Sequence, residues 1–216
     1  MANPRGAPIV ILGMHRAGTS IVTNLLHRVG ISMGDDFLPP DGFNPNGYFE
    51  DTDFLWINKG ILENAEGIWY DPPSIDEIIV GGEKFKSAIR KTVARKRQKA
   101  GQNSWGWKDP RNCLTCWNYA HEVPDARFIV VVRNLSDIKL SLNRTHGHLA
   151  NWDNVIDAYY DSVDEFFGTC INSSLNVGFE ELVYEKYARE TIRKILYFVD
   201  KPDRFIDKAL SVIRFR

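Results

Sequence analysis

The apolar residues of the chain follow two patterns, which predict two kinds of secondary structure. Continuous apolar, β-branched runs occur at 8–12 and 127–132, and the shorter segments 104–108 and 175–179 are also strand candidates. The first run, Pro-Ile-Val-Ile-Leu, is bounded by Pro8 and Gly13. Runs of this length are typical of strands that are buried on both faces, as in a parallel sheet.

Between these runs, apolar residues recur three or four positions apart, as on one face of a helix. This spacing predicts helices at 19–29, 54–65, 112–121, 136–144 and 151–170, with further helices up to the C-terminus. Gly30 is the expected C-terminal cap of the first helix. The stretch 84–99 carries eight basic residues around the apolar stripe Phe85, Ile89 and Val93, which predicts a helix with a solvated basic face. The segment 35–47, rich in proline, is predicted to be a loop.

Strands alternate with helices along the chain, and this order favours an α/β fold. We expect a P-loop-like parallel sheet of about four to five strands, flanked by helices on both faces. A chain of 216 residues buries one sizeable core, so residues 1–216 are interpreted as a single domain. Sheets of this kind bind ligands beyond the carboxyl ends of their strands, which makes the residues after each strand candidate site residues.

Composition and charge narrow the classes of function. The formal net charge is −1, so no overall field attracts nucleic acid, and there is no run of about 18 apolar residues that could form a membrane span. Residues 1–8 lack the apolar core of a signal peptide, and three cysteines in a chain of this length do not make a disulfide framework. We expect a cytoplasmic protein with neither a nucleic-acid nor a membrane partner, and the sequence does not define its oligomeric state.

The residues after the first strand, Gly13-Met-His-Arg-Ala-Gly-Thr-Ser20, have the strand–loop–helix setting of a P-loop. In such a loop, backbone N–H groups and the start of a helix converge on a phosphate. The candidate phosphate-binding residues are His15, Arg16, Ala17, Gly18, Thr19 and Ser20. Thr19 stands where nucleoside-triphosphate P-loops have lysine, and Arg16 supplies a cation from inside the loop. The loop therefore predicts phosphate binding without identifying the nucleotide.

A second phosphate anchor is predicted after the strongest strand. Arg133 ends that strand, and Ser141 follows eight residues later on the next predicted helix. An arginine at the carboxyl end of a strand faces the ligand crevice, where its planar guanidinium group suits a phosphate. Ser141, about two turns into the helix, is placed to bond the same group. With the glycine loop, this pair indicates a ligand that carries two separated phosphates.

Five segments together resemble the sulfotransferases that use 3′-phosphoadenosine-5′-phosphosulfate (PAPS), in particular the bacterial type. His15 to Ser20 is similar to their P-K-S-G-T-T loop, and Arg133 to Ser141 is similar to their 3′-phosphate motif. Trp107-Lys-Asp-Pro-Arg111 and Asn44-Pro-Asn-Gly-Tyr-Phe-Glu-Asp51 resemble their K-D-P and N-P-x-G-Y-F-E-D segments, and Phe179-Glu-Glu-Leu182 resembles their Y-E-D-L segment. These segments occur in the family's order from about residue 9 to residue 200.

The resemblance implies transfer of a sulfonate group from PAPS to the hydroxyl of a small-molecule or glycan acceptor, without a metal and with 3′,5′-diphosphoadenosine as the second product. It assigns Arg16 to the leaving phosphate, Lys108 to the second cation, and Arg133 and Ser141 to the 3′-phosphate. The aromatic residue that often follows the loop is Ile21 here, so Phe179 is expected to pack on the adenine. The R-K-G segment of the cytosolic members is absent, and Arg214 or Arg216 is a candidate replacement.

The base that takes the acceptor proton is expected to be a carboxylate. Cytosolic members of the family have a histidine two residues after the lysine that corresponds to Lys108, and Pro110 occupies that position here. Glu50 is our choice, because it follows the loop after the first helix, where related bacterial members keep a glutamate. Asp36, Asp51 and Asp109 are rivals, and Asp109 is expected instead to orient Lys108 or to cap the next helix.

Several other features have plainer interpretations. Cys113 and Cys116 are interpreted as core residues of a helix. His146 and His148 are interpreted as parts of a flexible loop, with contact to a metal or to the acceptor as the alternative. The tryptophans are expected in the core, with some available to stack on a sugar. Two alternatives to sulfonate transfer stay open: a P-loop kinase-like phosphotransferase with an altered loop, and a non-catalytic nucleotide-binding relative.

Overall fold

A computed structural model describes residues 6–42, 44, 47–170 and 172–215. Its centre is a sheet of four parallel strands in the order β2-β1-β3-β4. The strands are β1 (Pro8–Leu12), β2 (Trp105–Lys108), β3 (Arg127–Val132) and β4 (Ser174–Gly178). All four strands were predicted, to within one residue at each end. From β1 the chain goes first to β2 on one side and then to β3 on the other side. The strand order therefore reverses between β1 and β3, and α/β sheets bind ligands at such a switch point.

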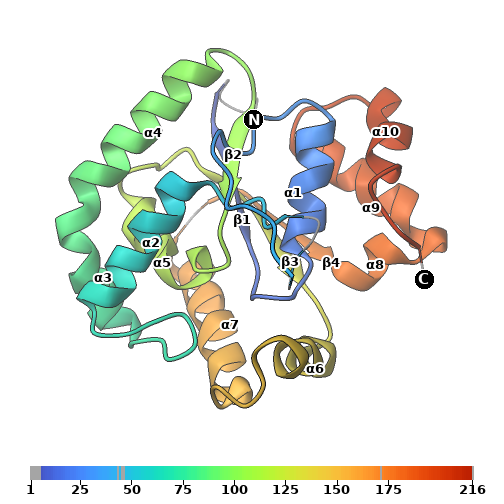
Figure 1. Cartoon of the computed structure of the whole chain (residues 1–216). Helices are drawn as coiled ribbons and strands as arrows, with labels where there is room; N and C mark the ends of the chain where they lie inside the picture. Colours follow the sequence, from blue (N-terminus) through green and yellow to red (C-terminus); the bar gives the residue numbers. More distant parts are fainter. Residues whose placement is uncertain (1–5, 43, 45–46, 171, 216) are drawn as a thin grey trace.

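Helices cover both faces of the sheet, as predicted (Figure 1). They are α1 (Thr19–Arg28), α2 (Thr52–Asn64), α3 (Ile75–Gly82), α4 (Lys86–Ala100), α5 (Asn112–Ala120), α6 (Leu135–His146), α7 (Trp152–Thr169), α8 (Phe179–Val183), α9 (Glu185–Phe198) and α10 (Ile206–Leu210). Short 3-10 turns lie at Glu83–Phe85 and Asp203–Phe205. Within the described ranges, no helix is both long enough and apolar enough to cross a membrane.

Successive side chains of a strand point to opposite faces, and this alternation divides the apolar interior into two layers. Ile9 and Ile11 of β1 pack with residues of α1, α9 and α10. Val10 and Leu12 pack on the other face with residues of α2, α5 and α7. Both faces of β1 are therefore buried away from water, and this is why its sequence is continuously apolar.

The secondary structure departs from the prediction in three places. Helix α3 was not predicted, although Ser74 and Glu77 form a capping box at its start that the sequence pattern S-x-x-E announces. The basic face of α4 is not wholly solvated, because Lys96 is buried among carboxylates. Phe179, predicted as the last residue of a strand, is the first residue of α8.

The segment after α1 runs along the outer edge of β2 and then closes a loop. Ser32 pairs with Trp105, and the N–H of Gly106 donates to the Ser32 carbonyl at 2.8 Å. Further on, the N–H of Leu38 donates to the Glu50 carbonyl at 2.8 Å. Residues 38–50 are therefore held at both ends, and we refer to them as the 38–50 loop.

Gly106 permits the close approach of β2 to β1. A Cβ atom added at Gly106 would lie 2.0 Å from the carbonyl oxygen of Ile9, whereas one added at Gly168 in α7 meets nothing within 4 Å. We expect Gly106→Ala to lower the free energy of unfolding by about 3 kcal/mol, the upper range for overpacking. Gly168→Ala, the control, should be neutral or stabilising by up to about 1 kcal/mol. Urea unfolding monitored by circular dichroism measures both, and equal stabilities would contradict the strand packing described here.

Candidate active site

The glycine loop joins β1 to α1 and presents an uncapped helix start. Gly13 and Gly18 have φ angles of 151° and 99°, and Arg16 between them has a φ of 71°. The N–H of Gly13 donates to the Cys113 sulfur at 3.0 Å, and that of Ala17 to the Met14 carbonyl at 3.0 Å. No side chain of the described residues caps the start of α1, and its first turn holds no acidic residue. The start of α1 therefore has N–H groups without a side-chain partner, which makes the loop suitable for an anion.

Phe179 and Gly18 depend on each other. A Cβ atom at Gly18 would lie 2.3 Å from the Phe179 ring, so only glycine lets the ring lie against the loop. The guanidinium carbon of Arg133 lies 4.3 Å from the centre of the same ring. Arg133 is thus held over an aromatic face just beyond the carboxyl end of β3, a contact that was not predicted from the sequence.

The two predicted phosphate anchors meet through side chains. Arg16 donates from Nε to the Ser141 hydroxyl at 2.9 Å, and Arg133 donates from Nη1 to the Arg16 carbonyl at 2.8 Å. Arg133 also pairs with Asp137 at 3.4 Å. Residues more than a hundred positions apart in the sequence are therefore joined in one hydrogen-bonded group.

A buried cluster of charges lies at the carboxyl end of β2. Lys108 is 1% exposed and donates to Oε1 of Glu50 at 2.9 Å. Arg111 lies 3.7 Å from the other oxygen of Glu50 and 2.8 Å from Oδ1 of Asp109. Burial alone lowers the pKa of Arg111, but the charges of Asp109 and Glu50 outweigh it and raise that pKa. Asp109 orients Arg111 and not Lys108, and it accepts the N–H of Arg111 at 2.9 Å at the start of α5, close to the alternative expectation that it caps this helix.

The glycine loop, Arg133, Lys108, Glu50 and Arg111 line one cleft. Its volume of about 610 Å³ is within the size range of small-molecule sites. The predicted residues that line it are His15, Arg16, Gly18, Thr19, Ser20, Glu50, Lys108, Arg133 and Phe179. Ala17 is fully buried beneath the loop, and Ser141 contributes only through Arg16. Arg214 is exposed away from the cleft lining, and Arg216, Pro45 and Asn46 lie outside the described residues.

Asp41, Tyr48 and Arg111 of the cleft wall were not predicted as site residues, and Trp69 and His146, which also line the cleft, were given plainer interpretations. Tyr48 and Arg111 stand beside residues already singled out, in the segments that contain Glu50 and Lys108, and this proximity was the available signal. The Tyr48 hydroxyl donates to Asp41 at 2.8 Å, and burial followed by this bond raises the pKa of Tyr48 to about 12. The Ser20 hydroxyl donates to the Tyr48 carbonyl at 3.1 Å, which joins the 38–50 loop to the glycine loop.

The histidines of the cleft are placed differently from the expectation. His146 is the last residue of α6, not part of a flexible loop, and its ring lies 5.2 Å from that of Trp69. His15 also packs against Trp69, with its ring 4.3 Å from the Trp69 ring. Burial and then the charge of Arg111 hold the pKa of His15 well below its usual range, and burial followed by Arg16 lowers that of His146.

Two of the rival carboxylates have structural partners outside the cleft lining. Asp51 caps α2 by accepting from the N–H of Asp53 at 3.1 Å, and it also accepts from the N–H of Asp35 at 2.9 Å. Asp36 accepts from the Thr52 hydroxyl at 2.8 Å. Glu50 is therefore the one of the four candidate bases that lines the described part of the cleft.

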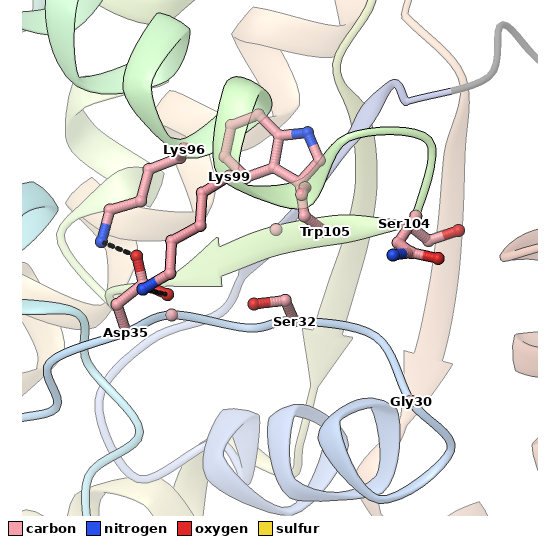
Figure 2. A pocket seen from close by; sticks show the side chains of 11 residues that line it. Gly30, Ser32, Asp35, Lys96, Lys99, Ser104 and Trp105 are labelled. Carbon is pink, nitrogen blue, oxygen red and sulfur yellow. Dashed lines mark hydrogen bonds and ion pairs between the residues drawn. The ribbon is translucent and has the colours of Figure 1, made fainter.

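Lys96 of α4 fixes the residue next to Glu50. Its ammonium group is hydrogen-bonded to Asp51 and lies 3.2 Å from Asp35 and 2.9 Å from Asp53. Burial lowers the pKa of Lys96, but the hydrogen bonds that Lys96 donates to Asp51 and Asp53 raise it by more, so Lys96 stays charged. Figure 2 shows Lys96 and Lys99 reaching from one helix to Asp35 on the segment after α1. We call this group the Lys96 cluster.

A second hollow of about 350 Å³ lies beside the Lys96 cluster and is bordered by Gly30, Ser32 and Trp105 (Figure 2). None of the predicted site residues lines it, so the larger cleft is the candidate active site. Cys113 and Cys116 are buried in α5, as predicted. Trp105 and Trp107 are in the core, whereas Trp56 is exposed.

Breaking the Lys96 cluster should destabilise the protein strongly. Lys96→Met leaves the buried Asp51 carboxylate without its cation, so we expect a loss of about 3–5 kcal/mol in the free energy of unfolding. Lys99→Met is the matched control, because Lys99 pairs with the same Asp35 but its side chain is 66% exposed; its effect should stay within about 0.5 kcal/mol. Chemical denaturation of both variants tests this, and similar losses for the two would contradict the assignment.

Comparison with known proteins identifies the family and the fold. The model of a family described as the sulfotransferase family matches residues 8–204. The structure is similar to that of sulfotransferase STF9 from Mycobacterium avium, with 14% identity and a TM-score of 0.53 over 97% of this chain and 67% of that one. It is also similar to mouse sulfotransferase SULT7A1 complexed with PAP, with 11% identity and a TM-score of 0.50 over 97% of this chain and 64% of that one.

The chain spans about two thirds of the length of both these proteins. At such identities the likeness to solved structures concerns the fold alone, and curated proteins gave no match. The family model carries the assignment, because it covers most of the chain and agrees with the resemblance seen in the sequence motifs. The chain belongs to the sulfotransferase family.

Proposed function

We propose that this protein transfers a sulfonate group from PAPS to an acceptor hydroxyl of a carbohydrate or small metabolite. The observation that carries the proposal is the gathering of Arg16, Lys108 and Arg133 around a glycine loop and an uncapped helix start, in one cleft at the carboxyl ends of parallel strands. Such a cleft suits a ligand with several negative charges. The mouse relative was solved in complex with PAP, which supports a donor of this type.

The proposed donor contacts divide along the cleft. The loop N–H groups from His15 to Ser20 and the hydroxyls of Thr19 and Ser20 bind the phosphate of the 5′ end. Arg133 and Ser141 bind the 3′-phosphate, and Phe179 packs on the adenine. Because Arg16 already contacts Ser141, the two phosphate sites are coupled, and a bound donor must share or replace that bond.

The transfer step requires positioning, cations and a base, and the cleft holds a candidate for each. The acceptor oxygen forms a new bond to sulfur while the bond from sulfur to the 5′-phosphate oxygen breaks. Arg16 stabilises the charge on the leaving phosphate, and Lys108 stabilises the sulfonyl oxygens. The hydroxyl proton goes to Glu50, whose Oε2 is farther from a cation than its Oε1.

The two alternative functions differ from sulfonate transfer in the ligands and turnover that they require. A kinase-like enzyme would need ATP and a divalent cation, and a non-catalytic relative would bind a nucleotide without turnover. No cluster of three or more His, Cys, Asp or Glu side chains that could hold a metal occurs among the described residues. The cytoplasmic location and the class of acceptor stay predictions, and the sequence makes no prediction of the oligomeric state.

We expect 3′,5′-diphosphoadenosine to stabilise the protein and ATP with magnesium to do so far less. At 100 times the dissociation constant a ligand adds about 2.7 kcal/mol, which for a protein of this size raises Tm by about 5–10 °C. Equal stabilisation by ATP and magnesium would favour the kinase alternative.

Arg133→Ala should weaken the binding of 3′,5′-diphosphoadenosine by about 2–5 kcal/mol. The same variant should bind adenosine 5′-phosphosulfate, which lacks the 3′-phosphate, nearly as well as the wild-type protein does. Arg144→Ala, an exposed change on α6, the helix that follows Arg133, is the control.

Glu50→Gln should lower kcat by about 10²- to 10⁴-fold and leave the affinity for 3′,5′-diphosphoadenosine nearly unchanged, because the amide keeps the size of the side chain but accepts no proton. Asp36→Asn is the control, since Asp36 does not line the cleft. Rates of ³⁵S transfer from labelled PAPS, with calorimetry for the affinity, make the comparison. A fall in donor affinity that matches the fall in kcat would assign Glu50 to the structure of the site and not to proton transfer.

A further inference from the structure

The side chain of His15 has no role in the donor contacts proposed above, where the loop acts through its backbone. Its ring packs against Trp69 and lies 6.0 Å from the ring of Tyr159. Its Nε2 is buried and has no hydrogen-bond partner among the described residues. Leaving a buried nitrogen unpaired costs about 1–3 kcal/mol, and such groups are rare in folded proteins. A side chain of this kind on the wall of a cleft is therefore expected to serve a ligand.

The wall against which His15 packs is rigid. The Tyr159 hydroxyl donates to the Trp69 carbonyl at 3.0 Å, and the Trp152 ring stacks on the Trp69 ring at 5.9 Å. Trp152 is buried, and its Nε1 donates to the Gly147 carbonyl at 2.8 Å. The imidazole is thus held in place before any ligand binds, which lowers the entropic cost of recognition.

His15 and Glu50 share the same cationic neighbours. Arg111 lies 3.7 Å from Glu50, and Lys108 is bonded to Glu50 at 2.9 Å. Burial and then Arg111, Lys108, His146 and Arg16 keep the pKa of His15 low, so the imidazole is neutral at physiological pH. A neutral imidazole has one donor nitrogen and one acceptor nitrogen, which suits hydroxyl groups.

We infer that His15 binds the acceptor through a hydroxyl next to the one that reacts, and that the acceptor is an uncharged polyol such as a sugar. This rests on the proposed function, in which the reacting hydroxyl gives its proton to Glu50. A second hydrogen-bonding group in the same cleft as Glu50 is fully used only by a compound with neighbouring hydroxyls. An acidic acceptor is disfavoured, because Lys108 and Arg111 already have carboxylate partners.

The test uses ³⁵S-labelled PAPS with a panel of methyl hexosides and their monodeoxy derivatives. With the wild-type protein, removing one particular hydroxyl from the best hexoside should lower kcat/KM by about 10- to 100-fold, the cost of an unpaired buried group. His15→Phe keeps a ring against Trp69 but offers no nitrogen. It should lower kcat/KM for the hexoside to the level of that deoxy derivative and change the deoxy derivative little, as in a double-mutant cycle. His15→Gln, which keeps a donor and an acceptor, should restore part of the loss.

His148→Phe is the control, because His148 is exposed and lies outside the cleft lining. The affinity for 3′,5′-diphosphoadenosine, measured by calorimetry, should be the same in all variants. Equal losses for the hexoside and its deoxy derivative in His15→Phe would make His15 a structural residue and overturn the inference. So would the absence of transfer to any hexoside by a protein that binds 3′,5′-diphosphoadenosine. Failure to bind 3′,5′-diphosphoadenosine would instead contradict the proposed function itself.

Discussion

The ion pair between Lys96 and Asp51 determines where one wall of the cleft lies. Asp51 caps α2, follows Glu50 directly, and accepts a bond from the backbone of Asp35, so one carboxylate ties together three segments. Gly34 has a φ of 142°, and a Cβ atom there would lie 3.0 Å from Asp51, so the backbone approaches this carboxylate closely. A surface ion pair contributes little to stability, whereas breaking a buried one is costly. The 38–50 loop therefore has a fixed base.

The cations of the cleft have partners within the protein. Lys108 and Arg111 face Glu50 and Asp109, and Arg16 bonds Ser141. Each cation that is proposed to meet the donor thus has a partner inside the protein, which limits the cost of burying it. A polyanionic ligand then binds by exchange of partners, and part of its attraction is used to displace the internal bonds. Such an exchange favours a ligand that contacts several of these cations at once.

The local pattern of residues predicted the strands of the sheet and the glycine loop well. It did not predict contacts between side chains that are far apart in the sequence. The strands were found because both faces of β1 and β3 are dry, which leaves a continuous apolar run. The glycine loop was found because its chemistry is contained in eight consecutive residues. Lys96 was taken for a solvated residue, since its partners Asp35, Asp51 and Asp53 lie more than forty positions away and only tertiary structure brings them together.

The same difference between local patterns and long-range contacts explains how much of the candidate site could be predicted. Lys108 and Glu50 were proposed together from motifs, and their contact at 2.9 Å could not be derived from the spacing of either motif. The bond between Arg16 and Ser141 spans 125 positions and had no signal in the sequence. The preference of Asp109 for Arg111 over Lys108 depends on the turn that starts α5, where the N–H of Arg111 also donates to Asp109.

Arg16 combines a charge with an unfavourable backbone conformation. Its φ of 71° lies in the left-handed region, which costs a residue with a Cβ atom about 1–2 kcal/mol and costs glycine nothing. The position where the loop needs a cation is thus one where the fold would prefer glycine or asparagine. Selection or engineering for thermal stability alone would therefore tend to remove arginine from position 16, and a stabilised variant of this protein would lose its central loop charge unless activity were selected at the same time.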